Sequence, residues 1–246
     1  MPSDNHTIAE PCIKKRFSEF SRYVFPDTSF TVFQSLKKAG NMGRSVDDET
    51  RKHLYRFADT RADRVYSLRQ IHSKRIITVD DWHDGVEADG IICTDGSRTL
   101  GITSADCLPV FIFHPQRPCF GGFHSGWKGT GIVSNGIKRL GEVSGCGAEE
   151  FVAFIGPGIG SCCYNVDDER GSFFRREYGV DAAYEREGEW FLDLRAANVS
   201  LLTSAGISRI FVDDDCTVCN TAYGSFRREG AADYTLMLSL GRYITS

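Results

Sequence analysis

The sequence lacks a hydrophobic run long enough to cross a membrane, since no apolar stretch approaches the roughly 18 residues that a spanning helix needs. Residues 1–6, which read MPSDNH, are polar and lack the apolar centre of a signal peptide. We therefore expect a cytoplasmic protein.

An excess of one charge is also missing. The formal net charge is -4 at pH 7, the isoelectric point is about 5.9, and charged residues make up 25% of the chain. Nucleic-acid-binding domains usually carry a basic face, so we expect neither nucleic acid nor membrane as a partner. The oligomeric state stays open.

The chain contains no internal repeat, no low-complexity tract and no linker rich in proline and serine. A hydrophobic fraction of 41% in 246 residues is enough for one large core. We expect a loosely ordered segment over residues 1–25, followed by a single domain over residues 26–246.

Histidine is scarce, with six residues, whereas cysteine is abundant, with nine. An odd number of cysteines without an export signal argues against a disulfide framework. Cys216 and Cys219 have the CxxC spacing of redox and zinc sites. Because no second CxxC or histidine pair lies nearby in the sequence, we favour an ordinary structural role for them.

Short β-rich runs alternate with segments of helical periodicity, which predicts an α/β or α+β fold. Residues 88–123 are mostly strand-like with short turns, so we expect mixed or antiparallel sheets with helices outside. The expected strands are 29–34, 64–71, 75–79, 90–94, 99–104, 109–114, 119–123, 151–155, 190–192 and 209–212, and the expected helices are 47–57, 129–143, 167–178 and 194–205.

His72, Cys107 and His124 each follow or end a strand-like run. Two imidazoles and one thiolate suit a zinc ion with an open fourth position, which is typical of a catalytic rather than a structural site. The alternatives are a buried inert cysteine and ordinary surface histidines. The prediction therefore depends on whether the three side chains meet.

Two further segments offer positive charge for an anion. The turn from His124 to Gly129 contains two glycines, Trp127 and Lys128 before an expected helix, which favours phosphate binding. Arg227 and Arg228 are adjacent and could clamp a phosphate or carboxylate. A capped helix with a packed tryptophan and a solvated charge run are the simpler alternatives.

The order of seven short motifs is more specific than any one of them. QIH, ADG, TSADCLPV, HSGWKG, IGPGIGSCCYNV, CT and SFRRE follow one another between residues 64 and 229. In this order they resemble the YfiH-like family, also called laccase-domain or multicopper polyphenol oxidase proteins and described as purine nucleoside phosphorylases.

The resemblance implies a YfiH-like fold with a duplicated α/β motif and mixed β-sheets in layers, in one catalytic domain. It implies zinc bound by His72, Cys107 and His124. It also implies phosphorolysis of adenosine, inosine and methylthioadenosine to a free base and ribose 1-phosphate, together with adenosine deaminase activity. A copper-dependent polyphenol oxidase activity is the older description of the family.

Two segments depart from the pattern of the family. An Arg-x-Gly-Gly-x-Ser segment is expected near the N-terminus, where residues 33–40 read FQSLKKAG. A Thr-Gly-Arg segment is expected shortly after the arginine pair, where residues 232–234 read ADY. If these segments contact substrate, the specificity of this chain differs from that of its relatives.

Our leading hypothesis is a zinc-dependent enzyme acting on purine nucleosides and phosphate, with zinc activating a water for deamination. Lys128, Arg227 and Arg228 are the candidates for binding phosphate. Asp106 is a catalytic candidate, either as a proton carrier or as a carboxylate that orients a metal ligand.

Three alternatives remain open. Cys107 as nucleophile and His124 as base would give a Cys/His hydrolase or amidase. Copper in the same site would give an oxidase, although multicopper oxidases need several histidine-rich sites and the chain has six histidines. The last alternative is a metal-binding module without catalytic activity.

Overall fold

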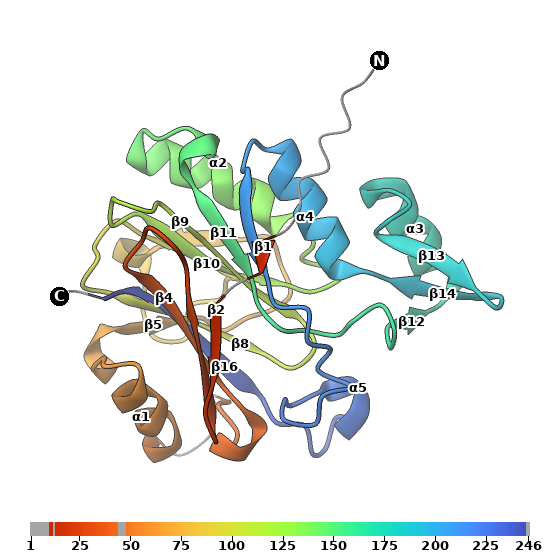
Figure 1. Cartoon of the computed structure of the whole chain (residues 1–246), viewed down its shortest axis with the longest axis horizontal. Helices are drawn as coiled ribbons and strands as arrows, with labels where there is room; N and C mark the ends of the chain where they lie inside the picture. Colours follow the sequence, from red (N-terminus) through yellow and green to blue (C-terminus); the bar gives the residue numbers. More distant parts are fainter. Residues whose placement is uncertain (1–9, 12, 44–47, 245–246) are drawn as a thin grey trace.

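Two mixed β-sheets packed face to face form the centre of the molecule (Figure 1). The structure is a computed structural model that describes residues 10–11, 13–43 and 48–244. The larger sheet has seven strands in the order β1-β15-β11-β9-β10-β7-β6. Its strands are β1 (Glu10–Pro11), β6 (Ile76–Thr78), β7 (Gly90–Cys93), β9 (Leu108–Phe113), β10 (Phe120–Ser125), β11 (Val152–Ile155) and β15 (Arg209–Val212).

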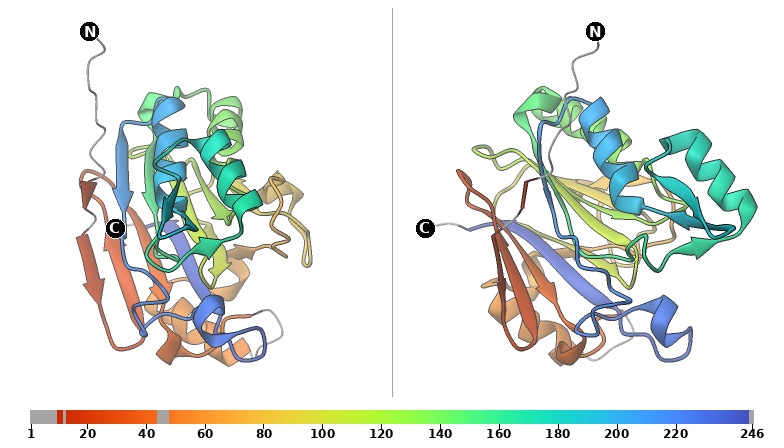
Figure 2. Two further views of the ribbon diagram at one scale, coloured as in Figure 1. Left: turned by 90° about the vertical axis from the view of Figure 1, so that its right-hand side faces the viewer. Right: turned by 45° about the vertical axis from the view of Figure 1, so that its right-hand side comes forward.

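The second sheet has six strands in the order β2-β3-β4-β16-β8-β5. Its strands are β2 (Ile13–Arg16), β3 (Phe20–Val24), β4 (Phe30–Ser35), β5 (Val65–Ser67), β8 (Thr99–Ser104) and β16 (Met237–Tyr243). A small antiparallel sheet of β12 (Asn165–Val166), β14 (Glu189–Leu192) and β13 (Ala183–Arg186) projects to one side with α3 (Asp168–Tyr178), as Figure 2 shows.

Aromatic side chains fill the space between the two large sheets. Phe30 of the six-stranded sheet stacks on Phe113 of the seven-stranded sheet, with ring centroids 4.2 Å apart. Phe111 and Phe154 lie in the same buried cluster. Because the six-stranded sheet covers one face of the larger sheet and helices cover the other, β9 and β11 have an uninterrupted hydrophobic sequence rather than an alternating one.

Helices cover the outer faces of both sheets. α2 (Ile132–Ser144) and α4 (Leu194–Ser204) pack on the seven-stranded sheet, whereas α1 (Asp48–Phe57) packs on the six-stranded sheet. Short helical segments complete the chain: η1 (Lys37–Ala39), η2 (Ala62–Arg64), η3 (Val79–Asp81), η4 (Ala148–Glu150) and α5 (Phe226–Glu229). No helix in the described part of the chain has the length and apolarity needed to cross a membrane.

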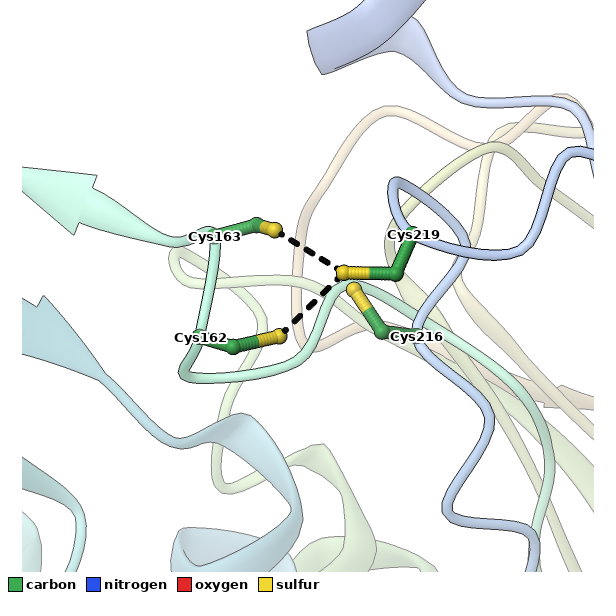
Figure 3. Close-up of side chains that lie close together, drawn as sticks. All are labelled: Cys162, Cys163, Cys216 and Cys219. Carbon is green, nitrogen blue, oxygen red and sulfur yellow. Dashed lines mark hydrogen bonds between the residues drawn. The ribbon is translucent and has the colours of Figure 1, made fainter.

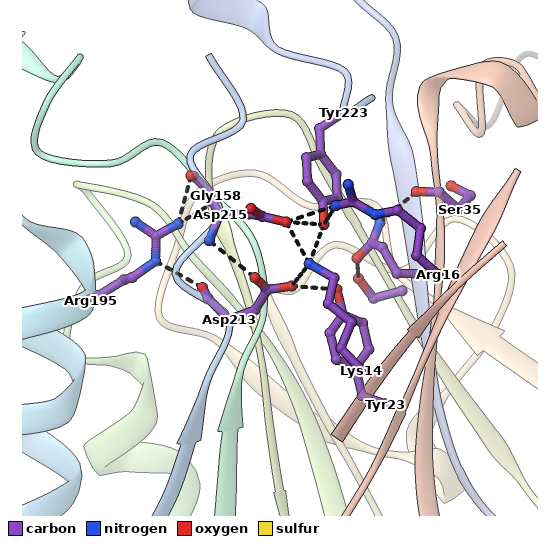
Figure 4. A network of polar contacts seen from close by, with 11 residues as sticks. Lys14, Arg16, Tyr23, Ser35, Gly158, Arg195, Asp213, Asp215 and Tyr223 are labelled. Atoms are coloured by element: carbon purple, nitrogen blue, oxygen red, sulfur yellow. Dashed lines mark hydrogen bonds and ion pairs between the residues drawn. The ribbon is translucent and has the colours of Figure 1, made fainter. Parts of the chain in front are cut away.

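A polar network joins the N-terminal strands to the segment that follows β15 (Figure 4). The Lys14 Nζ on β2 lies 2.7 Å from Asp213 Oδ2 and 2.5 Å from Asp215 Oδ2. The Tyr23 hydroxyl on β3 donates to Asp213 Oδ2 at 2.6 Å. Burial lowers the pKa of Lys14, but the Asp213 and Asp215 carboxylates outweigh burial and raise that pKa.

The predicted fold class is confirmed, since the structure combines mixed sheets in layers with outer helices. The strands expected at 99–104 and 209–212 have the same bounds in the structure. The helix expected at 129–143 begins three residues later, because Gly131, with φ 99°, precedes its first turn.

The prediction of a loose segment over residues 1–25 is wrong for most of its described part. Residues 13–16 and 20–24 are strands, and the side chains of Phe20 and Tyr23 are buried. Residues 1–9 and 12, and residue 47 of the first expected helix, lie outside the described residues. The single domain over residues 26–246 stays a prediction.

Candidate metal centre and pocket

Three chain segments bring His72, Cys107 and His124 together. Cys107 lies in the short link between β8 and β9, where the chain passes from the six-stranded to the seven-stranded sheet. His124 lies within β10, opposite Pro109 of β9. The His72 and His124 rings are 4.8 Å apart between centroids, and one ligand atom from each of the three residues lies within 4.8 Å of the others.

The prediction that the three residues follow or end strands is only partly correct. β5 stops at Ser67, so His72 lies five residues beyond it in a loop, and His124 is inside a strand. His72 has a φ of 60° and Asp106 a φ of 92°, which non-glycine residues rarely adopt. Such backbone strain clusters at functional sites, where the surrounding structure holds it in place.

Asp89 contacts both the His124 ring and the loop that carries His72. Its fully buried carboxylate lies 2.8 Å from Nδ1 of His124, which leaves Nε2 of that ring free for another ligand. The same carboxylate accepts the backbone N–H groups of Ile71, His72 and Ser73 and the hydroxyl of Ser73, at 2.6–3.2 Å. One carboxylate therefore fixes both the His124 ring and the loop of His72, as in many metal sites.

Close packing also depends on Gly126. A Cβ atom at this position would lie 2.6 Å from the Cys107 Sγ and 3.5 Å from the His72 Cδ2. Only a residue without a side chain leaves room for the Cys107 sulfur beside the His72 ring.

The electrostatics of the three residues favour a thiolate. Burial by itself raises the pKa of the Cys107 thiol, but the facing His124 and His72 imidazoles lower it to about 6. Burial lowers the pKa of His124, whereas the Cys107 sulfur and the Asp89 carboxylate raise it to about 9. The deprotonated sulfur is the form that binds metals or attacks electrophiles.

The three residues open into a cavity of about 540 Å³. This volume falls within the roughly 300–1,000 Å³ typical of small-molecule sites. Its walls carry four aromatic rings and three guanidinium groups. They belong to Trp127, Tyr164, Phe226 and Tyr234, and to Arg69, Arg170 and Arg227.

Asp106 lines the cavity, but hydrogen bonds occupy both its carboxylate oxygens. Oδ1 accepts the Thr217 hydroxyl at 2.6 Å, and Oδ2 accepts the Arg227 backbone N–H at 2.7 Å. Its backbone oxygen accepts the N–H of Ile159 at 2.8 Å. Asp106 therefore fastens the segment before Cys107 to two other loops.

The three candidates for phosphate binding lie in different places. Arg227 lines the cavity, where it donates to the Asn165 Oδ1 at 2.6 Å and lies over the Tyr164 ring. Lys128 is exposed over the Trp127 ring and does not line the cavity. Arg228 donates to the carbonyls of Thr217, Val218 and Tyr223, so its guanidinium holds a loop instead of facing the cavity.

Sequence reasoning missed two residues of the site, Arg170 in the cavity wall and Asp89 behind His124. Arg170 of α3 lies with its guanidinium carbon 4.2 Å from the centroid of the Trp127 ring. Asp89 belongs to the ADG motif, which was a usable signal, although its role depends on a contact 35 residues away. Two segments differ from the pattern of the family, residues 33–40 and residues 232–234. Tyr234 of the second segment lines the cavity, whereas residues 33–40 do not.

The CxxC pair is not alone in space. The Cys216 and Cys219 sulfurs lie beside Cys162 and Cys163 of the Gly-Pro-Gly loop, with all four sulfurs within 4.8 Å of one another (Figure 3). The sequence around Cys216 and Cys219 shows no second cysteine pair, because the pair that meets them in space is more than fifty residues earlier in the chain.

The fold and the site together define a mixed-sheet α+β protein with two histidines and a cysteine gathered at one pocket. A family model described as multi-copper polyphenol oxidoreductase laccase matches residues 24–242. The chain belongs to this family, and the resemblance to YfiH-like proteins is confirmed.

Two relatives that carry the name purine nucleoside phosphorylase are moderately similar to this chain. The chain is 31% identical over 173 residues to a purine nucleoside phosphorylase of Aquifex aeolicus, which covers 69% of this chain and 79% of that protein. It is 28% identical over 225 residues to a purine nucleoside phosphorylase of Clostridium acetobutylicum, which covers 88% of this chain and 93% of that protein.

Two crystal structures share the fold. YlmD from Geobacillus stearothermophilus superposes with a TM-score of 0.85 at 26% identity, covering 95% of this chain and 100% of YlmD. The hypothetical protein YfiH from Bacillus licheniformis superposes with a TM-score of 0.78 at 29% identity, covering 87% of this chain and 92% of YfiH.

Proposed function

We propose that this protein is a zinc-dependent purine nucleoside phosphorylase. Its substrates would be phosphate and adenosine, inosine or methylthioadenosine, its products a free base and ribose 1-phosphate, and it would also deaminate adenosine. The observation that carries the proposal is the convergence of His72, Cys107 and His124 at a cavity of about 540 Å³, in a chain whose relatives bear the name purine nucleoside phosphorylase.

The donor set fits zinc. Two imidazoles and one thiolate are ligands that zinc accepts, and a set of three leaves one position for a reactant. Asp89 orients the His124 ring from behind, and Gly126 leaves space for the Cys107 sulfur. Bound zinc supplies a Lewis acid, which polarises an oxygen or lowers the pKa of a water.

The cavity walls suit a purine nucleoside. Trp127, Tyr164, Phe226 and Tyr234 offer flat apolar surfaces on which a heteroaromatic base can stack. The guanidinium of Arg170 already lies over the Trp127 ring, so this wall combines a flat surface with positive charge. These side chains would orient the base and exclude water from the reacting centre.

A phosphate would need positive charge close to the ribose. Of the three sequence candidates we retain Arg227, because its side chain lines the cavity, and we add Arg170. Lys128 and Arg228 do not line the cavity. Asp106 would act as a positioning residue, since Thr217 and the backbone N–H of Arg227 occupy its carboxylate.

Incubation with inosine and phosphate, followed by chromatography, tests the proposal. We expect hypoxanthine and ribose 1-phosphate to form, to be lost in Cys107→Ala, and to disappear when a chelator removes the metal. Cys93→Ala, which removes a buried thiol outside the cavity, is the matched control and should keep activity. Turnover that persists in Cys107→Ala would remove the metal centre from the mechanism.

A Cys/His hydrolase or amidase is the second candidate. The lowered pKa of the Cys107 thiol, the facing His124 ring and the Asp89 carboxylate behind that ring form a nucleophile, a base and an orienting group. Iodoacetamide separates the two candidates. A metal-bound thiolate should resist alkylation until chelator is added, whereas a free nucleophile should react equally with and without chelator.

Copper in the same site would give the oxidase that the family description suggests. Among the described residues, the groups that could hold a metal contain at most two histidines each. Multicopper oxidation needs several copper sites rich in imidazole, so this donor set favours the zinc enzyme.

A further inference from the structure

Two loops that are distant in the sequence bring four cysteines to one point outside the pocket (Figure 3). Cys162 and Cys163 lie between β11 and β12, and Cys216 and Cys219 lie between β15 and α5. The Cys219 Sγ is 3.7 Å from the Cys162 Sγ and 3.4 Å from the Cys163 Sγ. All four sulfurs lie within 4.8 Å of one another, and the four thiols are free.

We propose that Cys162, Cys163, Cys216 and Cys219 form a second metal site, which binds a structural zinc ion through four thiolates. Zinc–sulfur bonds of about 2.3 Å at tetrahedral angles put neighbouring sulfurs roughly 3.8 Å apart. The sulfur separations of 3.4 and 3.7 Å are close to this value. A set of four protein ligands closes the coordination sphere, so this ion would hold structure and leave no position for substrate.

The backbone around the cluster is shaped for sulfur ligands. The N–H of Gly160 donates to the Cys216 Sγ at 3.2 Å, which stabilises negative charge on that sulfur. A Cβ atom on Gly160 would lie 3.1 Å from both the Cys162 Sγ and the Cys216 Cβ, so a side chain there would crowd the site. The Thr217 N–H donates to the Gly158 carbonyl at 3.0 Å and aligns the two loops.

Positive charge lies next to both cysteine pairs. A zinc ion with four thiolates carries a net charge of −2, which nearby cations stabilise. The Arg227 guanidinium donates to the Cys163 carbonyl at 3.4 Å, and the Arg228 guanidinium donates to the Val218 carbonyl at 2.9 Å. The arginine pair therefore clamps the same two loops that the zinc ion would join.

The site has a structural consequence for the pocket. Thr217, between the two cysteines of the CxxC pair, donates its hydroxyl to Asp106, the residue before Cys107. Tyr164, next to Cys163, lines the pocket, as does Arg227. Zinc at the cluster would thus fix one wall of the pocket without touching a reactant.

Elemental analysis of protein purified under reducing conditions tests the proposal. We expect wild type to hold one zinc ion per chain more than Cys162→Ser/Cys219→Ser, which removes the two exposed ligands. Cys93→Ser is the matched control and should hold as much zinc as wild type. Equal zinc contents in wild type and a folded double variant would overturn the proposal, whatever metal the pocket holds.

Cobalt substitution gives a test that does not depend on folding of the cysteine variant. His72→Ala/His124→Ala removes two ligands of the pocket and leaves the cluster intact, so a cobalt ion bound to this variant should report the cluster alone. We expect strong thiolate-to-cobalt charge transfer and the visible bands of tetrahedral cobalt. Absence of these bands, or a disulfide formed within the cluster in the presence of excess zinc, would contradict the proposal.

Discussion

At the scale of single residues, Asp89 connects the loop of His72 to the ring of His124. Burial raises the pKa of its carboxyl group, but hydrogen bonds from His124 and Ser73 outweigh burial and hold the pKa at about 2. Asp89 is therefore ionised near neutral pH, and its charge stabilises the orientation in which the His124 Nε2 faces Cys107.

Replacing Asp89 with Asn should weaken metal binding. The amide removes the negative charge behind His124 and accepts fewer hydrogen bonds, so we expect zinc affinity to fall about 10- to 100-fold. Competition with a chromogenic chelator measures this change. Ser73→Ala is the control, because it removes one donor to Asp89 and leaves the His124 contact intact, and its affinity should stay close to wild type. An unchanged affinity in Asp89→Asn would exclude the orienting role.

Replacing Gly126 with Ala should displace the Cys107 sulfur. The new Cβ would lie 2.6 Å from that atom, and overpacking of this kind costs roughly 1–3 kcal/mol of unfolding free energy. We expect the variant to lose zinc from the pocket while keeping its fold. A double-mutant cycle with Cys107→Ala checks the cause, because removing the sulfur should recover most of the lost stability. Additive effects of the two substitutions would rule out the clash.

The sequence alone identifies the candidate metal ligands. It does not identify the residues that position these ligands or the direction of the side chains around them. His72, Cys107 and His124 stand out as a zinc-type donor set in a specific motif order. The direction of a long side chain is not encoded locally. Arg227 and Arg228 are adjacent and identical in type, yet the first lines the cavity and the second donates to backbone carbonyls.

At the scale of single elements, the four-residue helix α5 is held by a side chain near its end. The Glu229 carboxylate accepts hydrogen bonds from the Lys37 Nζ at 3.0 Å and from the Thr235 N–H at 2.9 Å. Burial raises the pKa of Glu229, but these contacts and the Arg228 guanidinium outweigh burial and lower it. The charged carboxylate thus fastens the segment that carries Tyr234 into the pocket wall.

Glu229→Gln should destabilise the protein near neutral pH and less so in acid. Because the folded-state pKa lies below its ordinary value, the carboxylate stabilises the fold above about pH 4.5 and loses this contribution as the pH falls through the folded pKa. Urea unfolding should show a loss of roughly 1–2 kcal/mol near pH 7 that shrinks toward pH 3. Glu185→Gln, at an exposed position of β13, should change little. A loss of equal size at both pH values would argue against the charge as its cause.

Elements with local signals were predictable, and elements with distant partners were not. The helices expected at 129–143 and 194–205 are present as α2 and α4; the Asp193 side chain caps α4, and Gly145 ends α2 in a left-handed conformation. The strand β16 was missed, although it is nearly all buried between β4 and β8, because its sequence MLSLGRY lacks β-branched residues. The helix α5 is too short to show periodicity.

At the scale of the whole molecule, the polar network of Figure 4 joins the N-terminal strands β2 and β3 to the segment between β15 and α5. Lys14 and Asp213 are separated by 199 residues in the sequence and lie in contact in the structure. The polar sequence of β2, IKKR, carries no hydrophobic pattern that would indicate a strand, so the N-terminal segment looks loose when read alone. Long-range charge pairing of this kind cannot be inferred from one sequence.

Lys14→Met should destabilise the whole fold. The substitution keeps the unbranched shape of the side chain and leaves the buried Asp213 carboxylate without its cation, although the Tyr23 hydroxyl still donates to it. Because Lys14 is only partly buried, we expect a loss at the lower end of the range for broken buried pairs, about 3 kcal/mol of unfolding free energy.

Chemical denaturation of Lys14→Met measures this loss, and the neighbouring Lys15→Met supplies the control. Lys15 is exposed on the same strand, so removing its charge should change the unfolding free energy by less than about 0.5 kcal/mol. Equal effects of the two substitutions would mean that the network adds nothing beyond surface charge. A selective effect of Lys14→Met would instead support the view that the N-terminal strands are an integral part of the fold, since Lys14 contacts the segment that leads from β15 to the cysteine cluster.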